Sequence, residues 1–511
     1  MNKQSLIKGS IILGSAGILT RFLGLFFRWP LIMLIGDEGI GYYQMSYPLY
    51  MFFIAMASGV PVAISKMISE KNATNDIYGS FEVMKESAIL MAIIGTGTTL
   101  SLFFFAKEII VLLKWDAKAY YSLIGISFAP IVISFVTIFR GFFQGLQNMT
   151  PSAISQIIEQ LGRVIFGVGL AVILLPRGIE YSAGGAAFGA TAGAVLGGSY
   201  LYSKYEKIKR RYKIKNIKIN TEVLNTILKI AIPISLGTTV GSIMNLIDSI
   251  LVPQKLLDAG YTKTQATILY AQLTGKASVI INIPLTISMA ICTSLIPIIA
   301  EIFILKKQKE LMEKIDISMK MATIIAIPCT FGLFFLAEPV MKFIFQGRFD
   351  GIEILKYLSL TIPFIIITQT TTAILQGTGN YIMPVINLLI GCIIKVVLTW
   401  ILVPLGQFNI YGAVIASFGA YTVVSILNII TMKYKLRIKM RFYEIVIKPM
   451  YASVIMMLFV LISYNFLYKN TTSNGISCLI SILLGMIIYM SLIIAFKMFN
   501  IEEIKSRIRK R

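Results

Sequence analysis

Arginines that fall inside a long apolar run near the N-terminus are the residues of this sequence best suited to binding chemistry. Arg21 and Arg28 lie in the run 9–35, and steps of four, three and four residues connect them with Gly17 and Gly24. That spacing places all four residues on one face of a helix. Because a guanidinium matches phosphate oxygens with two parallel hydrogen bonds, this face predicts a cationic cavity for a diphosphate. The alternative is that each arginine reaches toward the membrane surface.

Three more basic residues inside apolar runs are candidate cavity cations, because a charge inside a membrane helix costs about 2.5–3.5 kcal/mol and usually faces a cavity. Arg163 follows Glu159 by four residues, so it forms either a salt bridge within one helix or a second cavity cation. Lys395 occupies the place of Arg163 in a later run, and Lys276 fits either the cavity or a helix interface. The balance of these charges is cationic, which favours an anionic substrate over a cationic drug.

A carboxylate and an amide on one later run are candidates for ion coupling. Asp248 is the only acid of the run 226–252, and it shares a helical face with Thr238, Gly241 and Asn245. An acid beside an amide inside a membrane helix can bind sodium or hold a proton. An ion pair between Asp248 and a basic residue such as Lys276 or Lys395 is the alternative.

Composition places the chain in a membrane. Of 511 residues, 56% are hydrophobic and 14% are charged, which is too apolar for a soluble protein. The chain has no histidine, so it lacks the usual proton shuttle, the commonest metal ligand and the serine or cysteine triads. We therefore expect no enzyme, no catalytic residue, no metal site and no cofactor. The net charge of +23 lies mainly in short loops, so we expect no nucleic-acid partner.

Fourteen apolar runs of about 20 residues, the length that spans a bilayer, predict fourteen transmembrane helices in an all-α polytopic membrane protein. The runs are 9–35, 41–65, 86–106, 121–143, 152–175, 183–203, 226–252, 274–300, 318–337, 354–375, 383–404, 410–432, 443–467 and 475–497. Basic residues gather in both tails and in every second loop, as in the segment 204–222. This distribution predicts a multi-pass protein of the cell membrane with both termini in the cytoplasm.

The two halves of the chain repeat each other in the same order. Gln144-Gly145-Leu146-Gln147-Asn148 returns 232 residues later as Gln376-Gly377-Thr378-Gly379-Asn380, and Arg163 returns as Lys395. Val60-Pro61 is echoed by Ile296-Pro297. A parallel repeat is typical of two lobes that rock about a central site during alternating access. We expect an N-lobe at 1–203, a basic cytoplasmic linker at 204–222, a C-lobe at 223–432 and a helix pair with a basic tail at 433–511. The candidate hinge residues are Pro61, Gly145, Pro297 and Gly377.

Several short motifs occur in a fixed order along the whole chain. They are Thr20-Arg21-Phe22-Leu23-Gly24, Gly39-Ile40-Gly41-Tyr42-Tyr43, Tyr47-Pro48, Gly59-Val60-Pro61-Val62-Ala63-Ile64-Ser65-Lys66, Gly275-Lys276-Ala277, Asn282-Ile283-Pro284, Ser294-Leu295-Ile296-Pro297 and Phe345-Gln346-Gly347-Arg348-Phe349. Together they resemble the stage V sporulation protein B family. That family belongs to the multidrug/oligosaccharidyl-lipid/polysaccharide exporter superfamily and is similar to the MurJ-type lipid II flippases.

The resemblance implies two six-helix lobes in a V, two extra C-terminal helices and a spore-forming Gram-positive source. Arg21 and Arg28 stand where the flippases have arginines in their first helix, and Asn245 with Asp248 matches an Asn-x-x-Asp that contributes to a sodium site in some members. The arginine of the flippases' second helix has no match after Tyr47-Pro48. Lys276 stands about one turn before the place of the arginine in their eighth helix.

We therefore expect a flippase that moves an undecaprenyl-linked cell-wall or polysaccharide precursor, similar to lipid II, in spore cortex peptidoglycan synthesis. Its expected partners are the undecaprenyl-diphosphate-linked sugar lipid and the lipid bilayer, with cell-wall synthases as further candidates. Either Na+ or a proton could couple transport to a gradient. The alternative is a cation-coupled multidrug antiporter of the same superfamily, which needs more acids in its cavity than Asp248 alone.

Overall fold

The protein, described by a computed structural model, is all-helical over the residues that the structure describes, which are 6–212, 221–436, 441–496 and 498. Residues 213–220 of the expected linker and most of the expected basic tail lie outside them. Contacts divide the chain into two compact units. Unit 1 comprises Met1–Gly275 with Thr399–Asn409, and unit 2 comprises Lys276–Leu398 with Ile410–Arg511.

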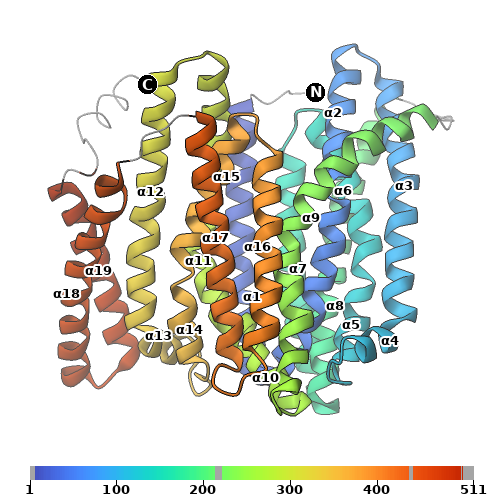
Figure 1. The fold of residues 1–511 in the computed structure, drawn as a ribbon. Coiled ribbons are helices and arrows are strands. Elements are labelled where there is room, and N and C mark those ends of the chain that lie inside the picture. Colours follow the sequence, from blue (N-terminus) through green and yellow to red (C-terminus); the bar gives the residue numbers. More distant parts are fainter. Residues whose placement is uncertain (1–5, 213–220, 437–440, 497, 499–511) are drawn as a thin grey trace. The chain divides into compact units, whose positions relative to one another are not determined.

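Unit 1 is a bundle whose long helices run side by side (Figure 1). Its helices are α1 (Leu6–Ala57), α2 (Gly59–Ala73), α3 (Ile77–Phe104), α4 (Ala106–Leu112), α5 (Ala119–Ser127), α6 (Ala129–Gly145), α7 (Thr150–Leu174), α8 (Ile179–Arg211), α9 (Thr221–Asp258) and α10 (Lys263–Ala271). A 3-10 turn at Leu175–Arg177 separates α7 from α8, and a π-helical turn at Gln272–Ala277 follows α10.

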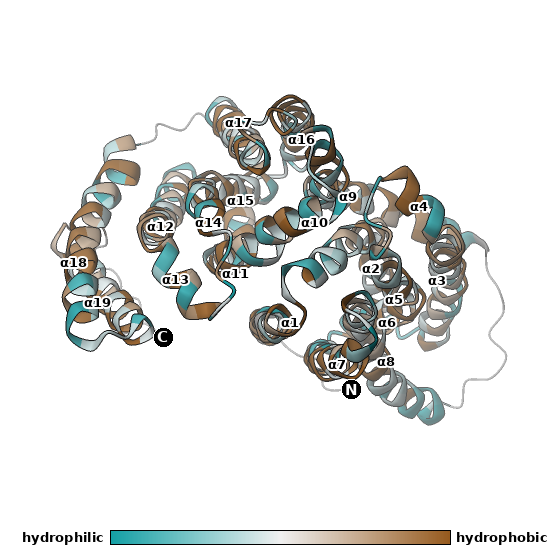
Figure 2. Cartoon of the chain, turned by 90° about the horizontal axis from the view of Figure 1, so that it is seen from below, coloured by the Kyte–Doolittle hydropathy of each residue, from teal (hydrophilic) through white to brown (hydrophobic). Residues whose placement is uncertain are grey.

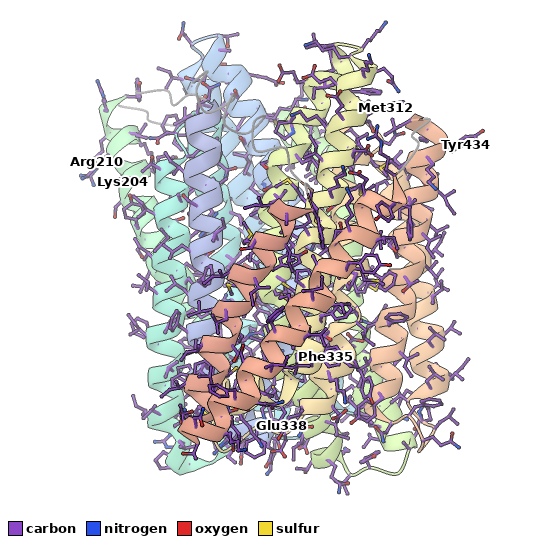
Figure 3. The ribbon with its side chains drawn as sticks, turned by 90° about the vertical axis from the view of Figure 1, so that its left-hand side faces the viewer. Lys204, Arg210, Met312, Phe335, Glu338 and Tyr434 are labelled. Atoms are coloured by element: carbon purple, nitrogen blue, oxygen red, sulfur yellow. The ribbon has the colours of Figure 1, made fainter. Side chains whose placement is uncertain are left out.

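Unit 2 contains the remaining helices. They are α11 (Ser278–Ile304), α12 (Gln308–Phe335), α13 (Ala337–Ile344), α14 (Ile352–Ser359), α15 (Ile362–Gly377), α16 (Ile382–Leu402, whose last turn belongs to unit 1), α17 (Ile410–Leu436), α18 (Lys448–Thr471) and α19 (Asn474–Ala495), with a π-helical turn at Tyr443–Ile447. Met312 and Phe335 mark opposite ends of α12 (Figure 3). Buried side chains from α11, α12, α15 and α17, among them Ile299, Ile315 and Ile374, form one hydrophobic cluster.

Most of these helices are suited to a lipid environment. Among the described residues, eleven helical stretches are long and apolar enough to cross a membrane, and twelve are if one bent pair counts as a span. Hydrophobic residues dominate helices such as α16 and α18, whereas the last turns of α8 are hydrophilic (Figure 2). The chain is therefore a multi-pass membrane protein.

Glycine and proline residues account for two breaks in the helices. α1 is interrupted at Gly36, whose φ of 65° and ψ of −170° are not helical and favour glycine. α14 and α15 correspond to the single run expected at 354–375, but they meet at an angle of 43°. Pro363 stands in the first turn of α15, where it lacks the N–H that would continue the preceding helix.

The repeated Gln-Gly motif has the same backbone structure in both units. Each copy ends a helix with a residue of positive φ at the fourth position, 56° at Gln147 and 80° at Gly379. The next amide returns to a carbonyl five residues earlier, Asn148 to Phe143 at 3.0 Å and Asn380 to Leu375 at 2.8 Å. Left-handed caps of this kind stop a helix while satisfying its last carbonyls. The sequence repeat is thus also a repeat of local structure.

The glycine of each copy makes matching contacts. A Cβ on Gly145 would lie 2.8 Å from the carbonyl oxygen of Ser65 on α2, and one on Gly377 would lie 3.0 Å from that of Ile296 on α11. Both glycines are buried, so α6 meets α2 as closely as α15 meets α11. Bulkier residues would force these helices apart. Gly145 and Gly377 therefore have equivalent roles in helix packing. Their role as hinges stays a prediction.

Candidate functional site

The break in α1 brings Arg28 next to Tyr47. The arm before Gly36 holds Phe27 and Arg28, and the arm after it holds Tyr43 and Tyr47. The rings of Phe27 and Tyr43 have centroids 5.8 Å apart, and the guanidinium carbon of Arg28 lies 5.9 Å from the centroid of the Tyr47 ring. An unbroken helix would separate residues sixteen positions apart by about 24 Å. The two arms therefore fold back against each other.

Arg163 on α7 approaches the same tyrosine. Its guanidinium carbon lies 6.0 Å from the centroid of the Tyr47 ring, and its Nη1 donates to the Tyr47 hydroxyl at 3.4 Å. Tyr43 stacks on Tyr47 with ring centroids 5.5 Å apart, and the ring centroids of Tyr47 and Tyr50 are 5.8 Å apart. We call Arg28, Arg163, Tyr43, Tyr47 and Tyr50 the arginine–tyrosine cluster. Its two guanidinium carbons are no more than about 12 Å apart, because both lie near one ring.

The cluster has an excess of positive charge. Among the described residues, no ion pair joins Arg28 or Arg163 to a carboxylate. The nearest acid in sequence, Glu159, instead accepts a hydrogen bond from Arg140 Nη2 at 2.7 Å, and Arg140 Nε donates to the Ser155 hydroxyl at 3.0 Å. The prediction of a salt bridge between Glu159 and Arg163, which was based on helical spacing, is therefore wrong. Arg163 is only 9% exposed, and its Nε is buried without a hydrogen-bond partner within the described part of the chain.

A row of glycines on α8 positions Arg163. Gly185, Gly189, Gly193 and Gly197 recur every four residues and face the backbone of α7. A Cβ on Gly193 would lie 2.2 Å from the carbonyl oxygen of Glu159 and 2.8 Å from the amide nitrogen of Arg163. Small residues at this spacing let two membrane helices approach closely. The α7 backbone is thus held where the Arg163 side chain meets Tyr47.

Arg21 lies outside the cluster. It precedes Arg28 by seven residues on the first arm of α1, about 10 Å along the helix axis, and its side chain is exposed. No atom lies within 4 Å of a Cβ built on Gly14 or Gly17, so the face around Arg21 is open. A Cβ built on Gly24, in contrast, would lie 3.5 Å from the Gln160 side chain of α7. The helical face predicted from Gly17, Arg21, Gly24 and Arg28 is therefore open at Gly17 and in contact with α7 at Gly24.

The residues expected to couple an ion lie on α9. Asn245 is exposed, and Asp248 one turn later is half-buried. The backbone beside Asp248 is fixed by Trp115, whose Nε1 donates to the carbonyl oxygen of Ser249 at 2.8 Å. Trp115 is only 1% exposed, so this contact holds α9 in place within unit 1. Ion binding by Asn245 and Asp248 stays a prediction.

The two predicted lysines belong to unit 2. The Lys276 ammonium is fully buried and donates to the carbonyl oxygens of Arg348 at 2.7 Å and Asp350 at 3.4 Å, with the Phe345 ring centroid 5.8 Å away. Lys276 thus holds the loop between α13 and α14. Lys395 on α16 is 2% exposed. Of the five predicted cavity cations, the structure therefore brings together Arg28 and Arg163.

Two features of this site were not predicted from the sequence. Tyr43, Tyr47 and Tyr50 share one face of the second arm at helical spacing, a signal that could have indicated the cluster. The pairing of Arg140 with Glu159 joins α6 to α7 across nineteen positions. No periodicity within one helix indicates such a contact.

Comparison with known proteins places this geometry among membrane transport proteins. A family model described as polysaccharide biosynthesis protein matches residues 6–303, and one described as MatE matches residues 274–401. The stage V sporulation protein B of Bacillus subtilis (strain 168) is 27% identical over 99% of this chain and 98% of its own length. The lipid II flippase MurJ of the same organism is 26% identical over 85% of both chains.

The fold has solved counterparts. A structure of the lipid II flippase MurJ in an inward closed conformation superimposes with a TM-score of 0.75, covering 95% of this chain and 99% of that one at 18% identity. The match along the whole chain to the stage V sporulation protein B of Bacillus subtilis confirms the resemblance to that family. These relatives are named for sporulation and lipid transport, in agreement with the expectation that the chain is not an enzyme.

Proposed function

The chain belongs to the polysaccharide biosynthesis protein family, and from this premise we propose that it is a flippase for an undecaprenyl-diphosphate-linked sugar. The observation that carries the proposal is the arginine–tyrosine cluster, in which two guanidiniums approach one ring with no paired carboxylate among the described residues. Two like charges held together are stabilised by an anion between them. A diphosphate supplies that charge and accepts several charge-assisted hydrogen bonds.

Arg28 and Arg163 would bind the diphosphate, with Arg21 as the cation that meets the head group earlier on its path. Arg163 thus takes the place of the second-helix arginine that the sequence lacks after Tyr47-Pro48. A buried donor left unpaired costs about 1–3 kcal/mol, so a phosphate oxygen near the Arg163 Nε would offset that cost. The tyrosine rings form an apolar wall beside the phosphate, and no bond is made or broken.

The proposal includes fourteen spans in the cell membrane with both termini in the cytoplasm. The count rises from eleven to fourteen if the bent pair α14–α15 is one span, the kinked stretch Ile12–Ala73 is two, and the glycine-rich α8 is another. Lobes at 1–203 and 223–432, joined by a linker at 204–222, would alternate access about Pro61, Gly145, Pro297 and Gly377. The helices of 433–511 would guide the prenyl tail.

The transported lipid is proposed to resemble lipid II and to serve spore cortex peptidoglycan, with cell-wall synthases as partners. Its relatives of known name support this choice, since one is a lipid II flippase and another a sporulation protein. Asn245 and Asp248 would couple movement to Na+ or protons, while Lys276 and Lys395 act from the second lobe. The alternative, a cation-coupled drug antiporter, is supported by the MatE match to residues 274–401.

A transport assay separates the two functions. Purified protein in lipid vesicles should expose fluorescent lipid II to an external quencher at least tenfold faster than protein-free vesicles, in the presence of either a Na+ or a proton gradient. Vesicles loaded with a cationic dye should show no gradient-driven exchange. Dye exchange without movement of lipid II, or of another prenyl-diphosphate sugar tested in parallel, would establish the antiporter instead.

A further inference from the structure

A second candidate binding site lies on unit 1, between α3, α6 and α8. It is a groove of about 1180 Å³ that shares no lining residue with the arginine–tyrosine cluster. Its volume exceeds the roughly 300–1,000 Å³ of most small-molecule sites. The groove therefore has room for a long ligand.

One part of the groove is apolar and open. Val132 and Phe135 of α6 face Val195 of α8, and Phe135 and Val195 are 41% and 46% exposed. Gly198 allows α8 to lie close to α6, because a Cβ at that position would be 3.0 Å from the Val136 side chain. In a membrane, an apolar groove along the helices is filled by lipid hydrocarbon chains.

The other end of the groove is aromatic and basic. Lys85 from the third turn of α3 and Lys209 from the last turn of α8 both line it. The rings of Phe81 and Tyr205 join these two helix ends, with centroids 5.6 Å apart, and Tyr205 also packs on Phe139 at 5.2 Å. Tyrosines in membrane proteins concentrate at the level of the lipid head groups. The groove thus changes from hydrocarbon-like to polar along its length.

Positive charge dominates this polar end. The last two turns of α8 carry five basic residues, of which Lys204 and Arg210 project from the helix (Figure 3), and the acid among them is Glu206. Glu206 Oε1 lies 3.9 Å from Lys209 Nζ, and Glu206 Oε2 lies 3.6 Å from Arg210 Nε. One carboxylate therefore compensates only part of the charge of these five basic residues. A phosphate head group complements what remains, because each lysine or arginine near a membrane attracts anionic lipid.

We infer that this groove is a binding site for an anionic phospholipid. The phosphate lies between Lys85 and Lys209, and one acyl chain follows the wall formed by Phe135 and Val195. In the orientation proposed above, this end faces the cytoplasmic leaflet, which carries the anionic lipids. The lipid holds α3, α6 and α8 together and is not the transported molecule.

Native mass spectrometry of the detergent-purified full chain tests this site with phosphatidylglycerol as the probe and phosphatidylcholine as the neutral reference. Wild-type protein should retain phosphatidylglycerol in preference to phosphatidylcholine. The double variant Lys85→Gln/Lys209→Gln should bind phosphatidylglycerol about thirtyfold more weakly, from about fivefold for each lysine. The matched control Lys204→Gln/Lys207→Gln removes the same charge outside the groove and should change the affinity less than threefold.

A second variant separates shape from charge. Ser199→Trp fills the groove but keeps both lysines, and it should also weaken phosphatidylglycerol binding at least tenfold without loss of folded protein. If the Lys85/Lys209 and Lys204/Lys207 double variants weaken phosphatidylglycerol binding equally, the binding depends on diffuse charge and the proposed site is overturned. Equal retention of both lipids would reduce the groove to a surface for bulk lipid. Displacement of phosphatidylglycerol by one equivalent of undecaprenyl diphosphate would assign the groove to the substrate and also overturn the inference.

Discussion

Replacement of Arg163 by alanine is expected to abolish lipid transport while the protein stays folded. The side chain supplies one of the two guanidiniums of the arginine–tyrosine cluster, and it forms no ion pair with a carboxylate among the described residues. Loss of a buried contact to a charged ligand costs about 3 kcal/mol, which lowers the transport rate more than a hundredfold. The vesicle assay with fluorescent lipid II measures this loss.

The stability of the same variant distinguishes binding from structure. Removal of one of two neighbouring positive charges relieves repulsion, so the thermal unfolding midpoint in detergent should stay equal or rise. Arg163→Lys should restore only part of the transport, because an ammonium lacks the planar fork of a guanidinium. Arg177→Ala, an exposed arginine just beyond α7, is the control and should transport normally. Full transport by Arg163→Ala would refute the role of this residue.

A single methyl group at Gly193 is expected to destabilise the protein strongly. Its Cβ would lie 2.2 Å from the Glu159 carbonyl oxygen, so α8 must move away from α7 and carry Arg163 out of register with Tyr47. Overpacking of this kind costs about 1–3 kcal/mol. Gly193→Ala should therefore lower both the thermal midpoint and the yield of folded protein, and it should impair transport.

The matched control is Gly169→Ala, on α7 itself, where no atom lies within 4 Å of the added Cβ. That variant should be as stable as the wild type or slightly more so, because alanine favours the helix. Thermal unfolding of both purified variants in one detergent gives the comparison. Equal midpoints for Gly193→Ala and the wild type would contradict the close packing of α7 on α8.

The helical class and the repeat could be predicted because both depend on patterns local to the chain. Apolar runs of spanning length indicate membrane helices whatever their neighbours. The Gln-Gly motif keeps its capping structure in both units because a left-handed cap is built from adjacent residues. The run 183–203 predicts a span that corresponds to α8, although α8 is not among the eleven stretches that are apolar enough to cross a membrane.

The partners of the charged residues could not be predicted, since they are set by contacts between helices. Helical spacing indicated an ion pair of Glu159 with Arg163, but the Glu159 carboxylate instead pairs with Arg140 from α6. The fold-back at Gly36, which places Arg28 beside Tyr47, depends on one glycine with positive φ among many glycines in apolar runs. The sequence is compatible with Lys276 in a cavity or at a helix interface. No sequence signal indicates its contact with loop carbonyls 72 and 74 positions away.

The central claim is that Arg28 and Arg163 bind one diphosphate together, and a double-mutant cycle of undecaprenyl diphosphate binding tests it most directly. The affinity of the purified protein would be measured for the wild type, Arg28→Gln, Arg163→Gln and the double variant. Each single change should weaken binding at least thirtyfold, and the double change should cost at least 1 kcal/mol less than the sum, because both groups hold one ligand. Wild-type affinity in both single variants, or effects that add within about 0.3 kcal/mol, would contradict a shared diphosphate site.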